Sequence, residues 1–169
     1  MAILGLAKQP IKIVCNGYKD SEFLRLAGIG QELGHHVNIV VEKLSELTTL
    51  LKEIDDLGIE PAIGIRIRLN SVGKGKWQNT GGEKGKFGFN ASQLLKAIAT
   101  LQQHNKLHLL TLVHFHIGSQ VANIRDIHNA MRECARHYAQ LRQLNVNITT
   151  VDVGGGLGVD YEGSRSRSA

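Results

Sequence analysis

Apolar runs with the pattern of β-strands alternate along this chain with runs in which apolar residues recur at helical spacing. Alternation of this kind predicts an α/β protein with a parallel sheet, because parallel strands need a crossover connection that a helix provides. The expected strands are residues 11–15, 37–41, 62–69, 109–115 and 148–153. The expected helices are residues 21–33, 45–57, 90–101 and 123–144.

Capping residues indicate where the expected helices begin and end. Ser21 and Ser45 are each expected to cap a helix, and Gly34 and Gly58 are expected to end these two helices. The segment 90–93, with Asn first and Gln last, predicts a capping box at the start of the third helix.

Two architectures contain such a sheet, an open doubly wound sheet and a (β/α)8 barrel. An open sheet binds its ligand at one switch point, whereas a barrel collects ligand residues from all its strand ends. In this chain candidate ligand residues follow nearly every expected strand, which favours the barrel. The expected strands are too few for a barrel that needs eight, so we expect a partial barrel with both ends cut. The candidate residues that follow the expected strands are Asn16, Glu42, Arg68, His116 and Gly154.

The composition is that of a globular domain with a core, with 169 residues, 42% hydrophobic and 21% charged. A formal net charge of +5 points weakly to anionic partners such as phosphate or carboxylate. Nucleic acid is not an expected partner, because few aromatic residues interleave with the basic ones. A membrane is not expected either, since no apolar run is long enough to span one. Cys15 and Cys134 have neither metal-ligand spacing nor a disulfide framework, which favours a reduced, intracellular setting.

Two segments that follow expected strands carry candidate chemistry. Gly154, Gly155 and Gly156 would let the backbone approach an anion closely and direct N–H groups at phosphate oxygens, although a tight structural turn would need the same residues. His116 could stack on a flat ring or carry a proton, and Ser119 could bind phosphate, although a histidine in this place is often structural.

Basic residues near two other strand ends are further candidates. Arg66 and Arg68 share one face of the strand 62–69. If that face points into a barrel, the guanidinium groups need anionic partners, either a ligand or an acidic residue of a neighbouring strand. Arg68 is nearer the carboxyl end of the strand and is the better ligand candidate. Lys19, just beyond the first strand, is expected to lie in a solvated loop.

Five segments together carry a family resemblance that covers about residues 11–165. They resemble the biosynthetic arginine decarboxylases, a branch of the pyridoxal-phosphate enzymes with an alanine racemase-like barrel. The histidine and triple-glycine motifs are shared across that barrel group, whereas the glycine- and lysine-rich segment and Cys-Asn-Gly-Tyr-Lys are more particular to the arginine branch. The segments are residues 14–20, 68–70, 81–88, 114–120 and 152–161.

The resemblance implies a role for each candidate. His116 would be the catalytic residue and would stack on the pyridine ring of pyridoxal 5'-phosphate. Ser119 and Gly154–Gly156 would bind its phosphate, and Arg68 would lie near its ring. The implied substrate-binding residues are Val151, Asp152, Val153, Gly158, Asp160 and Tyr161.

The resemblance also implies the domain and the reaction. Residues 1–161 would form about strands three to seven of a cofactor-binding TIM barrel, and residues 162–169 a disordered, truncated tail. The full-length enzyme would convert L-arginine to agmatine and CO2 for polyamine and spermidine biosynthesis, as a cytoplasmic, magnesium-dependent homo-oligomer. The resemblance assigns no magnesium ligand.

The family's cofactor-holding lysine is expected upstream of Ile11, so the chain alone is expected to be inactive. Two alternatives remain open at this stage. One is a decarboxylase of another basic amino acid, and the other is a non-catalytic, phosphate-binding α/β module.

Overall fold

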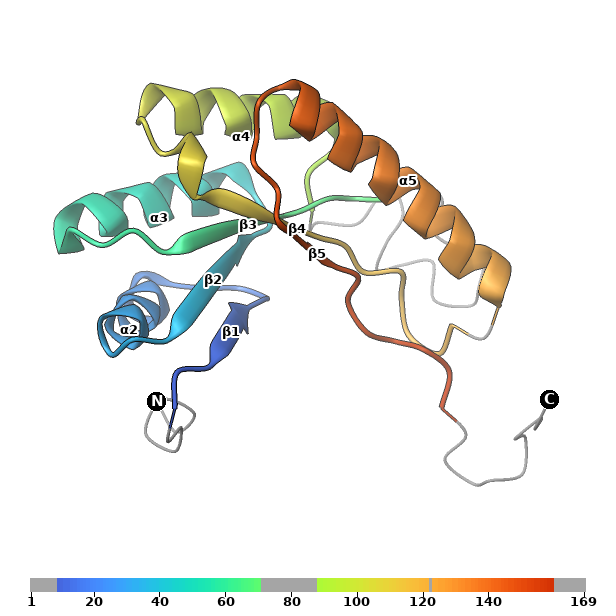
Figure 1. Cartoon of the computed structure of the whole chain (residues 1–169), viewed down its shortest axis with the longest axis horizontal. Helices are drawn as coiled ribbons and strands as arrows, with labels where there is room; N and C mark the ends of the chain where they lie inside the picture. Colours follow the sequence, from blue (N-terminus) through green and yellow to red (C-terminus); the bar gives the residue numbers. More distant parts are fainter. Residues whose placement is uncertain (1–8, 71–87, 122, 160–169) are drawn as a thin grey trace.

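The computed structural model describes residues 9–70, 88–121 and 123–159, and these form a parallel sheet with helices between its strands (Figure 1). Each strand confirms one of the expected strands, most of them with shorter ends. The glycine- and lysine-rich segment 71–87 and the expected tail 162–169 lie outside the described residues. The strands are β1 (Lys12–Cys15), β2 (His36–Val41), β3 (Ala62–Arg66), β4 (Leu110–His114) and β5 (Thr150–Asp152).

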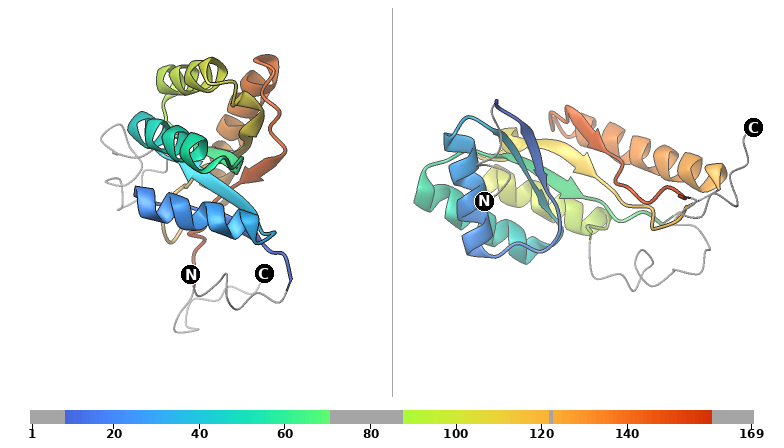
Figure 2. Two further views of the ribbon diagram at one scale, coloured as in Figure 1. Left: turned by 90° about the vertical axis from the view of Figure 1, so that its left-hand side faces the viewer. Right: turned by 90° about the horizontal axis from the view of Figure 1, so that it is seen from below.

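The strands follow one another in the sheet in the order of the sequence, β1-β2-β3-β4-β5, and every neighbouring pair is parallel. An open doubly wound sheet reverses its strand order at a switch point, and this sheet has no reversal among the described strands. The sheet curls and the helices lie along its outer side (Figures 1 and 2). This arrangement is a segment of a barrel, as expected.

The helices are α2 (Ser21–Glu32), α3 (Leu44–Leu57), α4 (Ala91–Gln103) and α5 (Ile124–Gln143), with a 3-10 turn, η1 (Leu107–Leu109), before β4. Among the described residues no helix is both long enough and apolar enough to cross a membrane.

Two of the predicted helix caps are wrong. The N-cap of α2 is Asp20, not Ser21, and its carboxylate accepts the Phe23 N–H at 2.8 Å. The N-cap of α3 is Lys43, which makes no side-chain cap bond, so Ser45 lies inside that helix.

The other predicted helix ends are confirmed. Asn90 and Gln93 form both bonds of the capping box, at 2.9 and 3.1 Å. Gly58 ends α3 with a φ of +65°, a left-handed conformation that favours glycine, and Gly34 follows the end of α2 with a φ of +89°.

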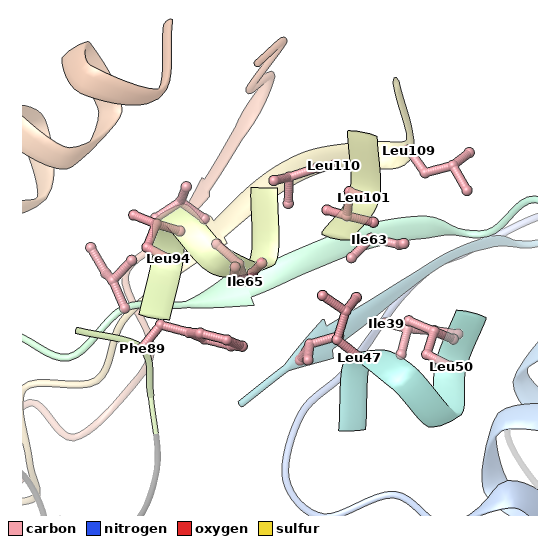
Figure 3. Close-up of a cluster of buried hydrophobic side chains, with 14 of the residues drawn as sticks. Ile39, Leu47, Leu50, Ile63, Ile65, Phe89, Leu94, Leu101, Leu109 and Leu110 are labelled. Carbon is pink, nitrogen blue, oxygen red and sulfur yellow. The ribbon is translucent and has the colours of Figure 1, made fainter. Parts of the chain in front are cut away.

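The core lies between the sheet and the outer helices (Figure 3). Ile63, Ile65, Ile67 and Leu69 alternate along the chain and are all buried, as the strand pattern predicts. Strand β3 ends before the expected residue 69. Beyond it, the Arg68 N–H donates to the Phe89 carbonyl oxygen at 2.9 Å, and the Phe89 N–H donates to the Arg66 carbonyl oxygen at 2.8 Å. Helices α3 and α4 complete the core with Leu47, Leu50, Leu94, Ala97 and Leu101.

Candidate active site

The carboxyl ends of the strands surround one pocket of about 350 Å³. Parallel strands end at the same edge of a sheet, and a pocket of this volume is in the range of small-molecule sites. Four of the five residues that follow the expected strands line it, but Arg68 does not, and the arginine in the wall is Arg66. The lining residues are Asn16, Gly17, Tyr18, Glu42, Arg66, His114, His116, Gly154 and Gly155.

Arg66 is held in the pocket wall by an acidic residue from the neighbouring strand. Its Nη1 lies 2.8 Å from Oε1 of Glu42, the residue after β2, and Glu42 Oε1 also accepts the Gly17 N–H at 3.3 Å. This confirms, for Arg66, the alternative in which a neighbouring acid pairs with the arginine, whose side chain is partly buried. Arg68 lies farther along the chain and donates from Nη2 to the carbonyl oxygen of Gly88 at 3.1 Å.

His114 and His116 line the same pocket, as strand alternation predicts. Nδ1 of His114 lies 3.0 Å from Oδ2 of Asp152 on β5. Burial lowers the pKa of His114, and Arg66 lowers it further, against the opposing effect of Asp152. Burial and Arg66 also lower the pKa of His116. Both imidazoles are therefore neutral near pH 7, which leaves the His116 ring free of charge for contact with a flat ligand.

The glycine turn after β5 packs directly against His116. Gly154 has a φ of +68°, and a Cβ there would lie 2.6 Å from the Phe115 carbonyl oxygen and 3.2 Å from His116 Nδ1. A Cβ at Gly155 would have no atom within 4 Å. The Gly154 N–H donates to Oδ1 of Asp152 at 2.9 Å, so this amide supports the turn, while Gly155 lies in the pocket wall.

The loops beyond β4 and β5 run side by side (Figure 1). The Val121 N–H donates to the Gly156 carbonyl oxygen at 2.8 Å, and the Gly158 N–H donates to the Val121 carbonyl oxygen at 3.0 Å. Gly156 has a φ of +97°, and a Cβ there would overlap the Gly118 carbonyl group and lie 3.3 Å from the Cα of Ser119. The structure therefore brings two of the predicted phosphate ligands together, Ser119 and Gly156, although neither is among the lining residues of the pocket.

The predicted substrate-binding residues lie on β5 and in the loop after it. Val151 and Val153 are exposed, Asp152 bonds to His114, and Gly158 lies in the paired loop. Asp160 and Tyr161 lie outside the described residues.

Lys19 is buried, so the prediction of a solvated loop lysine is wrong. Its Nζ lies 2.8 Å from Oε1 of Glu46, its side chain has no exposed surface, and it also donates to the Gly17 carbonyl oxygen. Oε2 of Glu46 accepts the Glu42 N–H at 2.7 Å. Sequence reasoning did not detect this network. The signal for it is a glutamate directly after β2, a second glutamate four residues later in the first turn of α3, and a lysine that follows β1.

The groups in the pocket suit a flat, anionic cofactor better than a metal ion. The wall offers neutral imidazoles, the guanidinium of Arg66 paired with the Glu42 carboxylate, and the backbone of a glycine turn that approaches closely. Within residues 9–70, 88–121 and 123–159, no group of three or more His, Cys, Asp and Glu side chains could hold a metal ion.

A family model described as the pyridoxal-dependent decarboxylase, pyridoxal binding domain, matches residues 1–169. The chain belongs to this family. The family resemblance seen in the sequence motifs is thereby confirmed.

Curated relatives in this family include biosynthetic arginine decarboxylases. The enzyme of Marinobacter nauticus is 62% identical over 170 residues, which cover 100% of this chain and 27% of that protein. The enzyme of Tolumonas auensis is 63% identical over 156 residues, 92% of this chain and 25% of that protein. The chain thus spans about a quarter of the length of these relatives.

Solved structures of this family share the fold. The biosynthetic arginine decarboxylase of Campylobacter jejuni superposes with a TM-score of 0.76 at 32% identity, over 89% of this chain and 24% of that one. The diaminopimelate decarboxylase of M. jannaschii superposes with a TM-score of 0.75 at 27% identity, over 91% of this chain and 35% of that one. The expected partial barrel of the α/β class is confirmed by these superpositions.

Proposed function

We propose that this chain is part of the pyridoxal 5'-phosphate-binding TIM barrel of a biosynthetic arginine decarboxylase, with residues 1–161 in that domain. The observation that carries the proposal is the shared pocket of His116, Arg66 and the Gly154–Gly155 turn at the carboxyl ends of the strands. The relatives named biosynthetic arginine decarboxylase support arginine as the substrate, with agmatine and CO2 as the products.

In this proposal the chain's own residues bind and orient the cofactor. The neutral His116 ring stacks on the pyridine ring, because an uncharged imidazole loses little solvation when it is covered. Ser119 and Gly154–Gly156 bind the phosphate, and Arg68 lies near the ring. When bound, pyridoxal phosphate supplies an electron sink for the electron pair that remains after loss of the carboxyl group.

The proposed substrate contacts come from β5 and the loop after it. Val151 and Val153 present exposed apolar surface, and Asp152 is anchored to His114 and to the Gly154 N–H. The proposed substrate-binding set also includes Gly158, Asp160 and Tyr161. The resemblance to the family further supports a cytoplasmic homo-oligomer that uses magnesium and serves polyamine and spermidine biosynthesis, with no nucleic acid or membrane as a partner.

Substrate turnover by the natural-length protein that carries this chain tests the function. Release of CO2 from L-arginine, L-lysine and L-ornithine is measured with pyridoxal phosphate present. We expect turnover of arginine and at most traces with the other two. Preference for lysine or ornithine would contradict the proposed substrate, and no turnover of any of the three would contradict the proposed reaction.

A pair of histidine variants tests the site. We expect His116→Ala to weaken pyridoxal phosphate binding by about tenfold or more, since a stacked ring contributes about 0.5–1.5 kcal/mol beyond its buried area. The matched control is His108→Ala, because the His108 side chain is 58% exposed and its partner is Glu60, remote from the pocket. Equal affinities in the two variants would contradict the assignment of His116.

A further inference from the structure

Glu42 joins segments on several sides of the pocket. Its carboxylate Oε1 accepts from Arg66 Nη1 at 2.8 Å and from the Gly17 N–H at 3.3 Å. Its carbonyl oxygen accepts the Gly88 N–H at 3.0 Å. The residue is 4% exposed, so these contacts are formed in a site that excludes most water. One buried residue thus connects the turn after β1, the end of β3 and the chain that leads into α4.

A second ion pair, between Lys19 and Glu46, holds the backbone at Glu42. Glu46 Oε2 accepts the Glu42 N–H at 2.7 Å, and Glu46 Oε1 lies 2.8 Å from Nζ of Lys19. The exposed fractions of the Glu46 and Lys19 side chains are 6% and 0%. A buried carboxylate with two such partners cannot turn away without leaving a buried charge unpaired, so the backbone at Glu42 is held in place.

Glu42 also sets where the positive charge of Arg66 lies. Among the described residues, the charged groups that shift the pKa of the pocket histidines are Arg66 from β3, Asp152 from β5 and Glu42 after β2, and the phenol of Tyr18 also lines the pocket. Arg66 is the charged group that lowers the pKa of His116, and it does so from the position that Glu42 fixes. The pKa of His116 therefore reports the position of the Arg66 guanidinium.

We propose that Glu42 is a positioning residue of this pocket, which fixes Arg66 and the turn after β1 on its two sides and so preorganises it for a flat, anionic ligand. The inference rests on the proposed function only in naming pyridoxal phosphate as that ligand. Glu42 acts through Arg66 and Gly17 and needs no contact with the ligand itself.

Three variants separate positioning from a merely structural role. Glu42→Ala removes the acceptor and the charge, and Glu42→Gln keeps an acceptor oxygen while it removes the charge. The matched control is Glu53→Gln. Glu53 is also a buried glutamate, 5% exposed, and its Oε2 lies 2.7 Å from Nε of Arg25, but the pair joins α3 to α2 away from the pocket.

The first readout is the NMR titration of the histidine ring signals in the 169-residue chain, with His116 assigned from a His116→Gln spectrum. We expect the pKa of His116 to fall in Glu42→Gln, because the guanidinium of Arg66 stays in place without its counter-charge, and to lie higher in Glu42→Ala than in Glu42→Gln, because Arg66 there loses the partner that holds it near the imidazole. Glu53→Gln should leave the pKa of His116 unchanged. Equal His116 titrations in folded Glu42→Ala and Glu42→Gln would overturn the proposal. If that variant does not fold, an unchanged titration in Glu42→Gln would overturn it equally.

The second readout is the affinity of the natural-length protein for pyridoxal phosphate. We expect Glu42→Ala to weaken binding by about tenfold, the scale of a lost hydrogen bond to a charged group, and Glu53→Gln to change it by less than about twofold. Equal losses in the two variants would show a general structural effect and overturn the proposal. If the unmodified protein binds no pyridoxal phosphate, the proposed function fails, while the histidine titration still decides the role of Glu42.

Discussion

Gly154 is the position where a single methyl group tests the geometry of the pocket most directly. Its φ of +68° is a conformation that alanine adopts at a cost of about 1–2 kcal/mol. An added Cβ would also lie 2.6 Å from the Phe115 carbonyl oxygen and 3.2 Å from His116 Nδ1. The first of these neighbours is backbone at the end of β4 and cannot move aside by changing a rotamer.

The expected effect of Gly154→Ala is the sum of these two causes. Overpacking of a tight site adds about 1–3 kcal/mol to the backbone cost, so we expect a loss of about 2–5 kcal/mol in the free energy of unfolding. The assay is urea-induced unfolding of the chain, followed by far-UV circular dichroism. We also expect weaker pyridoxal phosphate binding in the natural-length protein, since relief of the clash displaces the turn or the His116 ring.

Gly155→Ala is the matched control, because it adds the same methyl group one residue later. A Cβ there has no neighbour within 4 Å, so we expect the free energy of unfolding to change by at most about 0.5 kcal/mol. Any loss of cofactor affinity in this variant then reports contact between the methyl group and the ligand. Similar destabilisation by the two variants, or none by Gly154→Ala, would refute the reasoning.

Three further predictions concern buried groups elsewhere in the described structure. Glu46→Gln leaves the ammonium group of Lys19 buried without its counter-charge, and we expect urea unfolding to show a loss of about 3–5 kcal/mol; a loss under about 1 kcal/mol would contradict a buried pair. Because the pKa values of His114 and His116 are lowered in the folded state, the unfolded state binds more protons below about pH 6.5, so stability should fall as the pH is lowered from 7 to 5 and should not rise. Burial raises the pKa of Cys134 to about 11, so its thiol should react with a disulfide reagent only in urea, and rapid reaction of the native chain would contradict its burial.

The fold could be predicted from the sequence because its signals are local and periodic. The alternation of apolar residues from Ile63 to Leu69, and the capping box at Asn90 and Gln93, depend only on neighbours along the chain. The N-cap of α2 was predicted wrongly because two neighbouring residues suit that position about equally well. Asp20 and Ser21 are adjacent residues that both favour N-caps, and the carboxylate of Asp20 makes the bond.

The sequence predicted that the arginines of the site need anionic partners, but it did not predict which groups these partners are. Alternation placed Arg66 and Arg68 on one face, and burial required acidic partners, but the choice between a ligand and a neighbouring acid depends on strand register. In the structure Val41 pairs with Ile65, so Glu42 follows β2 at the level of Arg66. Lys19 was misjudged for the same reason, because its partner Glu46 comes from another βα unit and adjoins it only once the strands are aligned.

The electrostatics of the pocket wall follow from this alignment. The Arg66 guanidinium is matched by Glu42, and the Asp152 carboxylate is matched by His114 and by the Gly154 N–H. The Arg66 charge is thus paired within the protein, the two imidazoles are neutral, and the Asp152 carboxylate lies against one of them and against a backbone N–H. A ligand that enters the pocket contacts imidazole rings, the glycine backbone and the Arg66–Glu42 ion pair. Such a wall favours a flat molecule held by many modest contacts over a small ion held by one strong contact. A substitution that breaks one of these pairs should therefore change the charge state of the neighbouring groups before it removes any direct contact with the ligand.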